Sequence, residues 1–233
     1  MELKDPIKFL HETKKNLNEV GAVLPSSRFL AKEILSQVDV SSEPIRVLEV
    51  GAGTGVFTGM LLEKLRSDDS LDVCEINSAF VELLQNRIAQ HGLENGQLPQ
   101  VRVIGDSFLN IEPDERYDYI ISGLPINNFD ADFVTEIFDL YFRVLKPGGS
   151  LSYYEYLMIR TLSSPFRKED HKVRLEDVGE VVDSFNSRYQ FKQETVLLNV
   201  PPAIVRHLCR DGRGNGNGSN ENVCGAKGST EHH

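Results

Sequence analysis

The segment that most constrains the fold is a buried strand that ends in three closely spaced glycines. In VLEVGAGTG the strand pattern 47–50 is followed by Gly51, Gly53 and Gly55, and a helical pattern begins directly after them. Glycine lets the backbone turn tightly and approach a ligand closely, while the N-terminus of the next helix presents its backbone N–H groups. This strand–turn–helix pattern predicts a ligand-binding turn at the carboxyl end of a parallel sheet.

Apolar strand patterns and helical patterns alternate along most of the chain. Strands are predicted at 45–50, 71–76, 101–106, 117–123 and 150–157, and helices at 27–38, 56–65, 78–92 and 131–145. Strands that are apolar at nearly every position are typical of a parallel sheet covered by helices on both faces. After residue 160 a helix over 177–189 and a closing strand pair over 190–210 follow. We therefore predict an α/β fold with a Rossmann-like, doubly wound sheet, mostly parallel with a C-terminal antiparallel strand.

The chain divides into three parts. We expect N-terminal helices over residues 1–40, a ligand-binding α/β domain over 41–210 and a tail over 211–233. The first helical pattern, 6–20, has a short apolar face bordered by lysines, which suits a lid over the pocket or a contact with a membrane surface. The tail is rich in Gly, Asn and Ser and is expected to be disordered, because it buries too little apolar area to offset its ordering entropy.

Composition excludes several classes of protein. The net charge of −10 and the isoelectric point of about 5.1 argue against a chain whose whole surface binds nucleic acid. The three cysteines lack the spacing of metal ligands, so no metal site is expected. No signal peptide and no apolar stretch approaching eighteen residues is present, which predicts a cytoplasmic protein without a transmembrane span.

The spacing of the glycines discriminates between ligands. A dinucleotide site usually has G-x-G-x-x-G around a pyrophosphate, whereas here G-x-G-x-G follows Glu49 by two residues. This pattern resembles motif I of the class I S-adenosylmethionine (SAM)-dependent methyltransferases, whose ligand places an amino-acid carboxylate and a ribose at the turn. NAD binding and a glycine turn without a ligand are the alternatives. The resemblance implies SAM as the cofactor, with contacts from Glu49, Gly51, Ala52, Gly53, Thr54 and Gly55.

Two later acids stand where the same class has cofactor contacts. Glu75, with Ile76, ends the second strand, where a carboxylate can accept both ribose hydroxyls. Asp106, with Ser107, ends the third strand, where the resemblance implies a contact with the adenine amine. A surface acid at a strand end and a helix cap are the ordinary alternatives for these two positions.

The segment SGLPINNF follows the fourth strand, beside the place expected for the methyl group. Methyltransferases that modify adenine amines carry N-P-P-Y or N-L-P-Y here, in which the Asn holds the amine and the Tyr stacks on the base. This chain has Gly123 and Ile126 at those two places. Base recognition relies on stacking and edge hydrogen bonds, so a smaller, flexible amine suits the site better. The expected acceptor residues are Ser122, Gly123, Leu124, Pro125 and Asn127.

A closer resemblance covers about residues 5–210. GAVLPSSRFLAKEI, SGLPINNF and LLNVPPAIVRHL together resemble segments of the bacterial phospholipid N-methyltransferases. The resemblance implies a class I methyltransferase fold, peripheral membrane association and methylation of phosphatidylethanolamine or related aminolipids such as ornithine lipids.

Residues for such a substrate fall into three groups. Ser26 and Ser27 are expected near SAM or a lipid phosphate, with helix capping as the alternative. Aromatic faces hold a trimethylammonium group well, and those near the strand ends are Phe129, Tyr153, Tyr154 and Tyr156. The cations that could meet a phosphate are Arg160, Arg167, Lys168 and Arg206. Core packing and a solvated surface are the alternatives for these side chains, and the candidate general bases are Asp130, Asp132 and Glu155.

The sequence thus predicts a SAM-dependent N-methyltransferase that acts on an aminolipid headgroup at a membrane surface. An enzyme like the rRNA adenine N6-dimethyltransferases is disfavoured by the acidic charge and the missing Asn and Tyr. The motifs are also compatible with a methyltransferase for a small soluble amine and with a SAM-binding protein that lacks catalysis.

Overall fold

The computed structural model describes residues 28–40, 43–96, 98–112, 116–157 and 169–210, with side chains of the last range from residue 174 onward. The predicted helix 6–20, the serines Ser26 and Ser27, and the predicted disordered tail lie outside the described residues. So do the candidate cations Arg160, Arg167 and Lys168.

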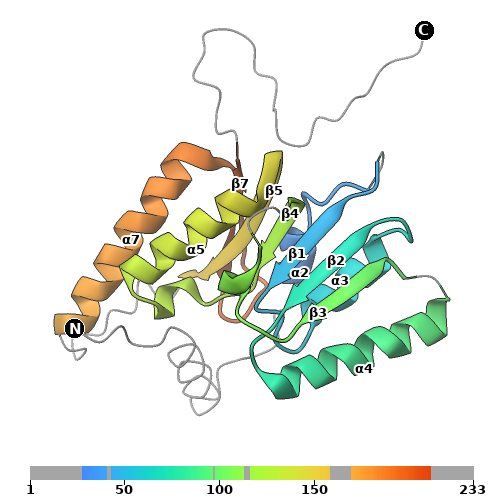
Figure 1. The fold of residues 1–233 in the computed structure, drawn as a ribbon. Coiled ribbons are helices and arrows are strands. Elements are labelled where there is room, and N and C mark those ends of the chain that lie inside the picture. The colour runs from blue at the N-terminus through green and yellow to red at the C-terminus, as the bar shows by residue number, and fades with distance from the viewer. Residues whose placement is uncertain (1–27, 41–42, 97, 113–115, 158–168, 211–233) are drawn as a thin grey trace, which may run out of the picture.

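A seven-stranded sheet forms the centre of the molecule (Figure 1), in the order β3-β2-β1-β4-β5-β7-β6. The strands are β1 (Arg46–Val50), β2 (Ser70–Cys74), β3 (Gln100–Ile104), β4 (Tyr117–Ser122), β5 (Leu145–Tyr156), β6 (Gln190–Val196) and β7 (Ala203–Cys209). The five strands from β3 to β5 pair in parallel, and β7 runs antiparallel to both of its neighbours. The predicted fold class, including the C-terminal antiparallel strand, is confirmed.

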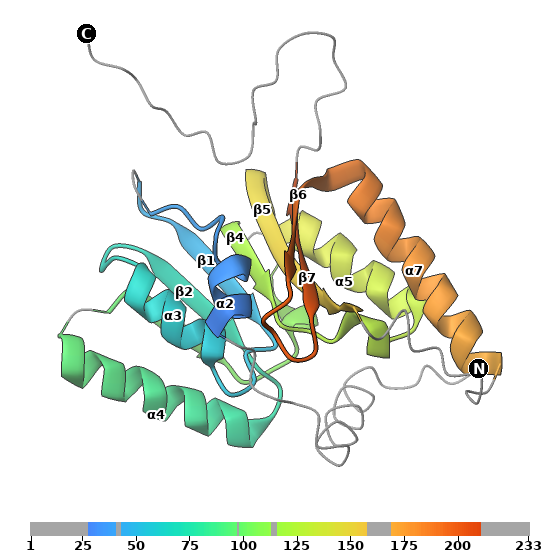
Figure 2. The same cartoon turned by 180° about the vertical axis from the view of Figure 1, so that it is seen from behind.

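Helices cover both faces of the sheet, as Figures 1 and 2 show from opposite sides. They are α2 (Arg28–Ile34), α3 (Val56–Lys64), α4 (Ser78–Asn95), α5 (Ala131–Val144) and α7 (Glu169–Tyr189), with short 3-10 helices η1 (Phe108–Asn110) and η2 (Ile126–Asn128). Side chains of α5 and α7 form one apolar core with one face of the sheet. Side chains of α2, α3 and α4 form a second core with the other face. Among the described helices, none combines the length and the apolarity needed to cross a bilayer.

Two of the differences from the prediction affect the end of α5 and the start of α7. Helix α5 was expected to end at the segment KPGG, but it ends at Val144 and these residues already belong to β5. Helix α7 begins at Glu169, eight residues before the predicted start at residue 177. This earlier start brings Arg174 into the helix, close to residues 122–129 at the end of β4, which we name the acceptor segment.

The order of the strands creates a crevice at their carboxyl ends. Strand β1 has β2 on one side and β4 on the other, so the chain changes direction across the sheet at β1. Loops after neighbouring parallel strands diverge at such a point and leave room for a ligand. The ligand-binding turn predicted after β1 therefore lies at the crevice.

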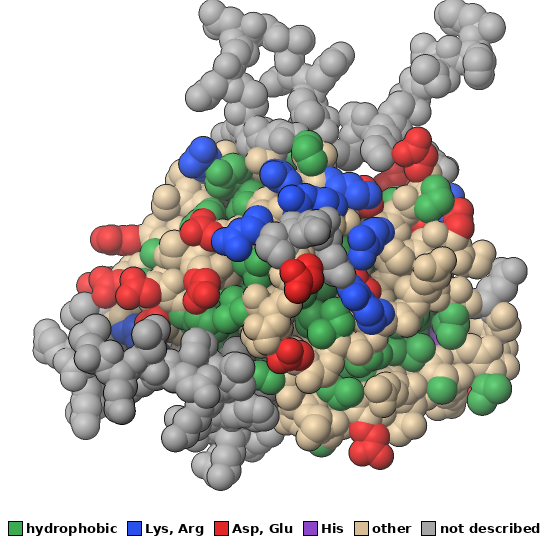
Figure 3. Space-filling model, viewed as in Figure 1, with side chains coloured by type: hydrophobic (Ala, Val, Ile, Leu, Met, Phe, Trp, Pro, Cys, Tyr) green, Lys and Arg blue, Asp and Glu red, His purple; other side chains and the backbone are tan. Residues whose placement is uncertain are grey.

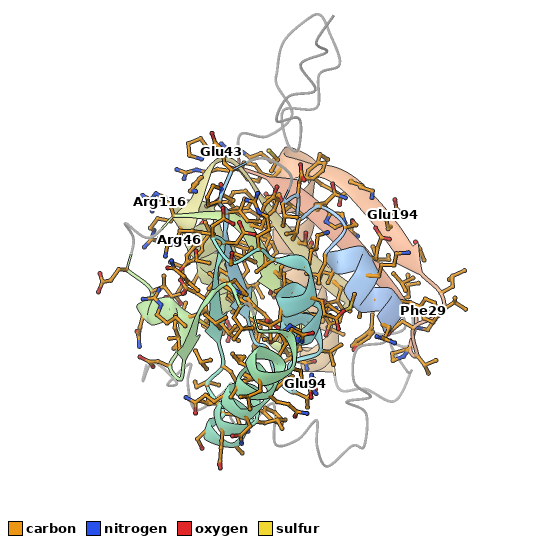
Figure 4. The ribbon with its side chains drawn as sticks, turned by 90° about the vertical axis from the view of Figure 1, so that its right-hand side faces the viewer. Phe29, Glu43, Arg46, Glu94, Arg116 and Glu194 are labelled. Carbon is orange, nitrogen blue, oxygen red and sulfur yellow. The ribbon has the colours of Figure 1, made fainter. Side chains whose placement is uncertain are left out.

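Basic side chains gather at the opposite end of the strands. Lys and Arg cluster in the upper part of the face seen in Figure 3, and Figure 4 places Arg46 and Arg116 at this end. Arg46 is the first residue of β1 and Arg116 precedes β4. Part of this charge is neutralised, because Arg46 and Arg102 pair with the buried Asp72. The cluster thus does not border the crevice.

A buried histidine lies between β5 and β7. His207 Nδ1 is 2.8 Å from Ser152 Oγ, and both side chains are buried. Its Nε2 has no hydrogen-bond partner among the described residues. Burial, with a smaller contribution from the positive charge of Lys192, lowers the pKa of His207 to about 4.

We expect His207 to make the protein less stable as the pH falls from 6.5 to 4. In this window the unfolded chain takes up a proton at residue 207 that the folded chain does not bind, because the pKa is 6.5 when unperturbed and about 4 in the fold. The contribution of His207 to the free energy of unfolding should fall by up to about 3 kcal/mol across the window, and the difference between the wild type and a variant without this histidine isolates it. Urea denaturation at a series of pH values measures this slope.

His207→Gln should remove this contribution from the pH slope, since glutamine does not titrate. The matched change His91→Gln, at a partly exposed position of α4, should leave the slope as it is in the wild type. Equal slopes in the wild type and in His207→Gln would contradict the assignment.

Candidate active site

The glycine turn after β1 is held against the end of β2. The backbone N–H groups of Gly51 and Ala52 both donate to the carbonyl of Cys74, at 2.9 and 3.3 Å. Gly53 has a φ of +56°, a conformation that side chains disfavour, and a Cβ placed there would meet no atom within 4 Å. The turn therefore presents bare backbone to open space on this side.

Glu75 fixes the shape of this turn. Its carboxylate is buried, and Oε2 accepts a hydrogen bond from Gly53 N at 2.8 Å while Oε1 accepts one from Asn77 N at 2.8 Å. Asn77 in turn caps α4 by accepting from Ala79 N. One side chain thus links the glycine turn to the start of the helix that follows β2.

Glu49 lies fully buried beneath the turn. Its Oε2 accepts a hydrogen bond from the hydroxyl of Thr58 at 2.7 Å, in the first turn of α3. Its Oε1 has no hydrogen-bond partner in the described part of the chain. Burial raises the pKa of Glu49 to about 7, although the hydrogen bond from Thr58 opposes the shift and the nearby Glu75 adds to it. The site thus contains a carboxyl group that a nearby positive charge would help to ionise.

A partly open pocket of about 290 Å³ lies at the carboxyl ends of β1 to β4. Its lining comes from the ends of all four strands: Val50, Gly51, Cys74, Glu75, Ile76, Asp106, Ser107, Phe108 and Leu124. Six of these positions were predicted as cofactor or acceptor residues. A second hollow of about 400 Å³ adjoins it and shares Asp106 and Ser107.

Asp106 lies exposed at the mouth of the pocket. Its carboxylate accepts hydrogen bonds from Asn110 Nδ2 at 3.0 Å and from Ser107 N at 2.6 Å, and these bonds lower its pKa. Ser107 caps η1 by accepting from Leu109 N at 3.3 Å. The cap of η1 is therefore Ser107 and not Asp106, so the capping alternative does not apply to Asp106, whose carboxylate lies at the pocket.

The acceptor segment packs directly on the glycine turn. Gly123 N donates to the carbonyl of Val50 at 2.8 Å, and a Cβ at residue 123 would lie 2.7 Å from the carbonyl oxygen of Gly51. The side chain of Leu124 fills the space beside Gly51, where an added Cβ would lie 2.7 Å from Leu124 Cδ2. No side chain fits at residue 123 without moving the turn, so the amide found there in adenine-amine methyltransferases has no room in this backbone arrangement.

Other acceptor-segment residues are buried and tied to α5. Ser122 Oγ lies 2.9 Å from the hydroxyl of Tyr141, and Leu124 N donates to Ser122 Oγ at 3.4 Å. Asn127 is buried in η2, the short helix that begins directly after Pro125. The segment is therefore a fixed wall of the crevice.

Three predicted substrate residues are engaged elsewhere. Phe129 is buried with its ring edge-on to Phe133, 5.2 Å between centroids. Tyr153 is buried and donates to Asn186 Oδ1 at 2.8 Å. The guanidinium of Arg206 pairs with Glu155 at 2.9 Å. None of these three side chains lines the pocket at the ends of β1 to β4.

Arg174 is a cation that the sequence reasoning missed. From α7 its guanidinium donates to the carbonyl of Asn128 at 3.4 Å, within the acceptor segment, and its Nε is buried without a hydrogen-bond partner among the described residues. The buried residues Val178 and Val182 follow it at intervals of four along α7. Extending that helical spacing one turn towards the N-terminus would have revealed Arg174 on the same face.

The carboxylate oxygens around the pocket, as hydrogen-bond acceptors, suit a small organic cation with hydroxyl groups. Gly53 leaves room for close approach, Glu75 offers carboxylate oxygens, and Glu49 has a buried oxygen without a partner among the described residues. These features fit SAM. In the part of the chain that the structure describes, no group of three His, Cys, Asp or Glu side chains is placed to hold a metal ion.

Comparisons with known proteins agree with this geometry. Residues 47–149 match a family model described as a methyltransferase domain. The ornithine lipid N-methyltransferase of Singulisphaera acidiphila is 27% identical over 150 residues, which cover 64% of this chain and 77% of that protein. Malonyl-[acyl-carrier protein] O-methyltransferase 1 of Ilyobacter polytropus is 23% identical over 165 residues, 67% of this chain and 58% of that protein.

Among solved structures, the N-methyltransferase NodS of Bradyrhizobium japonicum WM9, in complex with S-adenosylhomocysteine, has a similar fold. The TM-score is 0.58 at 14% identity, with 86% of this chain and 97% of NodS covered. The names of these relatives give different kinds of acceptor, so what they have in common is methyl transfer. The matching domain over residues 47–149 and the fold together identify the chain as a SAM-dependent methyltransferase with SAM as its cofactor.

Proposed function

We propose that the enzyme transfers methyl groups from SAM to the amine of an aminolipid headgroup, such as that of phosphatidylethanolamine or an ornithine lipid. The observation that carries this proposal is the close contact between Gly123 and the carbonyl of Gly51. It removes the side chain that would hold a planar base, and it leaves a narrow acceptor wall suited to a small amine. The similarity to an ornithine lipid N-methyltransferase supports the choice of a lipid.

The cofactor side of the site follows from the pocket. We assign the ribose hydroxyls to Glu75, because it lines the pocket at the end of β2 and carboxylate oxygens accept hydrogen bonds from hydroxyl groups. Asp106 and Ser107 lie where the adenine would be held, with Ile76 lining the same pocket. The backbone of Gly51, Ala52, Gly53, Thr54 and Gly55 would face the amino-acid part of the cofactor.

The remaining cofactor assignment is Glu49. Its Oε1, which has no partner among the described residues, lies under the turn, and a positive ligand would favour the ionised carboxylate. SAM supplies a methyl group bound to a positively charged sulfur. The chain's own task is to align the acceptor and to exclude water, through the rigid wall formed by Ser122, Gly123, Leu124, Pro125 and Asn127.

A side-chain base is not part of the proposal. Of the three candidates, Asp130 caps α5 by accepting from Phe133 N at 2.9 Å, and Glu155 pairs with Arg206. Asp132 is exposed in the first turn of α5. An amine must lose a proton before it can attack, and both burial and a neighbouring positive charge lower its pKa. We propose that solvent accepts this proton as the headgroup enters the site, where both effects act on the amine.

Arg174 is our candidate for the acidic part of the headgroup. Phosphate and carboxylate groups bind guanidinium groups by charge-assisted hydrogen bonds, and the buried Nε of Arg174 has unused donor capacity beside the acceptor segment. Arg206 is replaced in this role because Glu155, Gln190 and Gln193 already surround its guanidinium.

The function is tested by transfer of a radiolabelled methyl group. Purified enzyme with methyl-labelled SAM should label an aminolipid in total bacterial lipid, as resolved by thin-layer chromatography, and should leave rRNA and tRNA unlabelled. Label in RNA alone would overturn the proposal. Label only in soluble amines would restrict the enzyme to small acceptors.

Gly53→Ala should weaken SAM binding by about tenfold or more, because the new methyl group occupies the open approach to the turn. Gly96→Ala is the matched control, since Gly96 also has a positive φ and open space around it but ends α4 away from the pocket. Both changes should cost a similar amount of stability, about 1 kcal/mol.

Calorimetry measures SAM affinity for the two glycine variants, and denaturation measures their stability. Equal SAM affinity in both would remove the glycine turn from the cofactor site.

Arg174→Gln should raise the KM for detergent-dispersed aminolipid by about tenfold through the loss of a charge-assisted contact, while the affinity for SAM stays unchanged. Arg174→Lys should restore part of the loss. The matched control is Arg188→Gln, an exposed arginine near the other end of α7. Initial-rate kinetics at saturating SAM measure these effects, and a change confined to kcat would rule out a role in holding the headgroup.

A further inference from the structure

The turn between β6 and β7 displays apolar side chains to solvent. We name residues 197–201 the docking turn, and we propose that this turn, together with Phe29 of α2, inserts into the surface of a lipid bilayer and holds the crevice against it. The choice of a bilayer as partner rests on the proposed aminolipid substrate. The surface itself is identified by the structure alone.

The polarity of the docking turn is the reverse of that in an ordinary surface turn. Leu197, Leu198 and Val200 are 70%, 69% and 68% exposed, whereas Asn199 between them is only 3% exposed. The side chain of Asn199 points inward and donates to the carbonyl of Pro201 at 2.7 Å. A turn on a soluble protein usually directs its polar residues outward. Here the polar group stabilises the turn from inside and the aliphatic groups face outward.

The docking turn lies at the same end of the sheet as the crevice. Ala203 pairs with Tyr156, the last residue of β5, and with Val196, the last residue of β6. Strand β5 is parallel to β4, whose carboxyl end carries Gly123. The turn that joins β6 to β7 is therefore on the edge from which the pocket opens.

Phe29 lies at this end as well. Helix α3 runs away from the glycine turn, and Lys64 at its far end donates to the carbonyl of Leu35, just beyond the last residue of α2. Helix α2 therefore begins at the crevice end, where Phe29 is 55% exposed. Figure 2 shows both the start of α2 and the docking turn at the lower end of the view. Figure 4 shows Phe29 on the same outer side as Glu194 of β6.

Charge around Phe29 fits an anionic lipid surface. Arg28 and Lys32 are exposed on α2, one residue before and three residues after Phe29. Cations next to inserted apolar groups strengthen binding to anionic headgroups. The chain as a whole carries a net charge of −10, which repels such a surface. Binding must therefore come from a local apolar contact with flanking cations.

A bilayer fits the shape of this surface better than a protein partner does. The exposed aliphatic groups sit on a narrow turn and at one helix end, and interfacial binding strength scales with the apolar area that enters the headgroup region. A soluble protein would need a much larger continuous contact. An aminolipid acceptor also presents its amine at the level where the crevice would then open.

The chain contains no tryptophan, which allows a direct test of insertion. The variant Leu198→Trp would carry the sole indole. With vesicles of phosphatidylethanolamine and phosphatidylglycerol, its emission should shift to the blue and be quenched by lipids brominated in the acyl chains. An unshifted emission while the protein still sediments with the vesicles would overturn the proposal and assign binding to another surface, such as residues 1–27.

The double variant Leu197→Asp/Leu198→Asp should lower vesicle affinity at least tenfold in co-sedimentation. Its rate on detergent-dispersed lipid should match the wild type. Leu93→Asp is the matched control, because Leu93 is 89% exposed on α4, which packs beside β3 at the other edge of the sheet. It should bind vesicles normally. If Leu93→Asp and the double variant lose affinity equally, the docking turn is not the membrane contact.

These readouts separate the docking inference from the proposed function. Insertion of the indole in the Leu198→Trp variant without methylation of any lipid would keep the docking surface and reject the aminolipid acceptor. If lipid is methylated but the double variant binds vesicles like the wild type, the aminolipid acceptor is kept and the docking turn is rejected.

Discussion

The site depends on a backbone-to-backbone contact between the cofactor turn and the acceptor segment. Gly123 N donates to Val50 O, and the absence of a side chain at residue 123 lets the segment lie against the carbonyl of Gly51. Because β1 and β4 are hydrogen-bonded neighbours, this contact continues the sheet beyond its last paired residues. In the proposed site, this contact fixes the SAM side relative to the acceptor side, which is the alignment that methyl transfer requires.

The same contact limits which acceptors the site can take. Any residue with a side chain at 123 would push the acceptor segment away from the glycine turn, so a binding amide cannot be added there by a single substitution. Specificity for the acceptor must therefore come from groups around the segment. Arg174 on α7 is placed for that role, and its helix packs on the opposite face of the sheet from α2, α3 and α4.

The sequence predicted the features that depend on local order. The glycine turn, the acids after β2 and β3, and the segment after β4 were found because each follows directly from a strand end. The engagement of Tyr153 and Arg206 was not predictable in this way. Their partners Asn186 and Glu155 lie 33 and 51 residues away, so only the fold brings them together. Arg174 was missed because α7 begins earlier than its apolar pattern suggested.

The antiparallel direction of β7 decides where the described chain ends. Because β7 runs back along β5, Arg210 lies beside the start of that strand, where its backbone N–H donates to Gly149 at 3.1 Å and its guanidinium donates to the carbonyl of Leu145. Residue 210 therefore sits at the end of the sheet opposite the crevice. A reporter protein or an immobilisation handle joined just after this point would leave from the far side and keep the crevice open to its substrates.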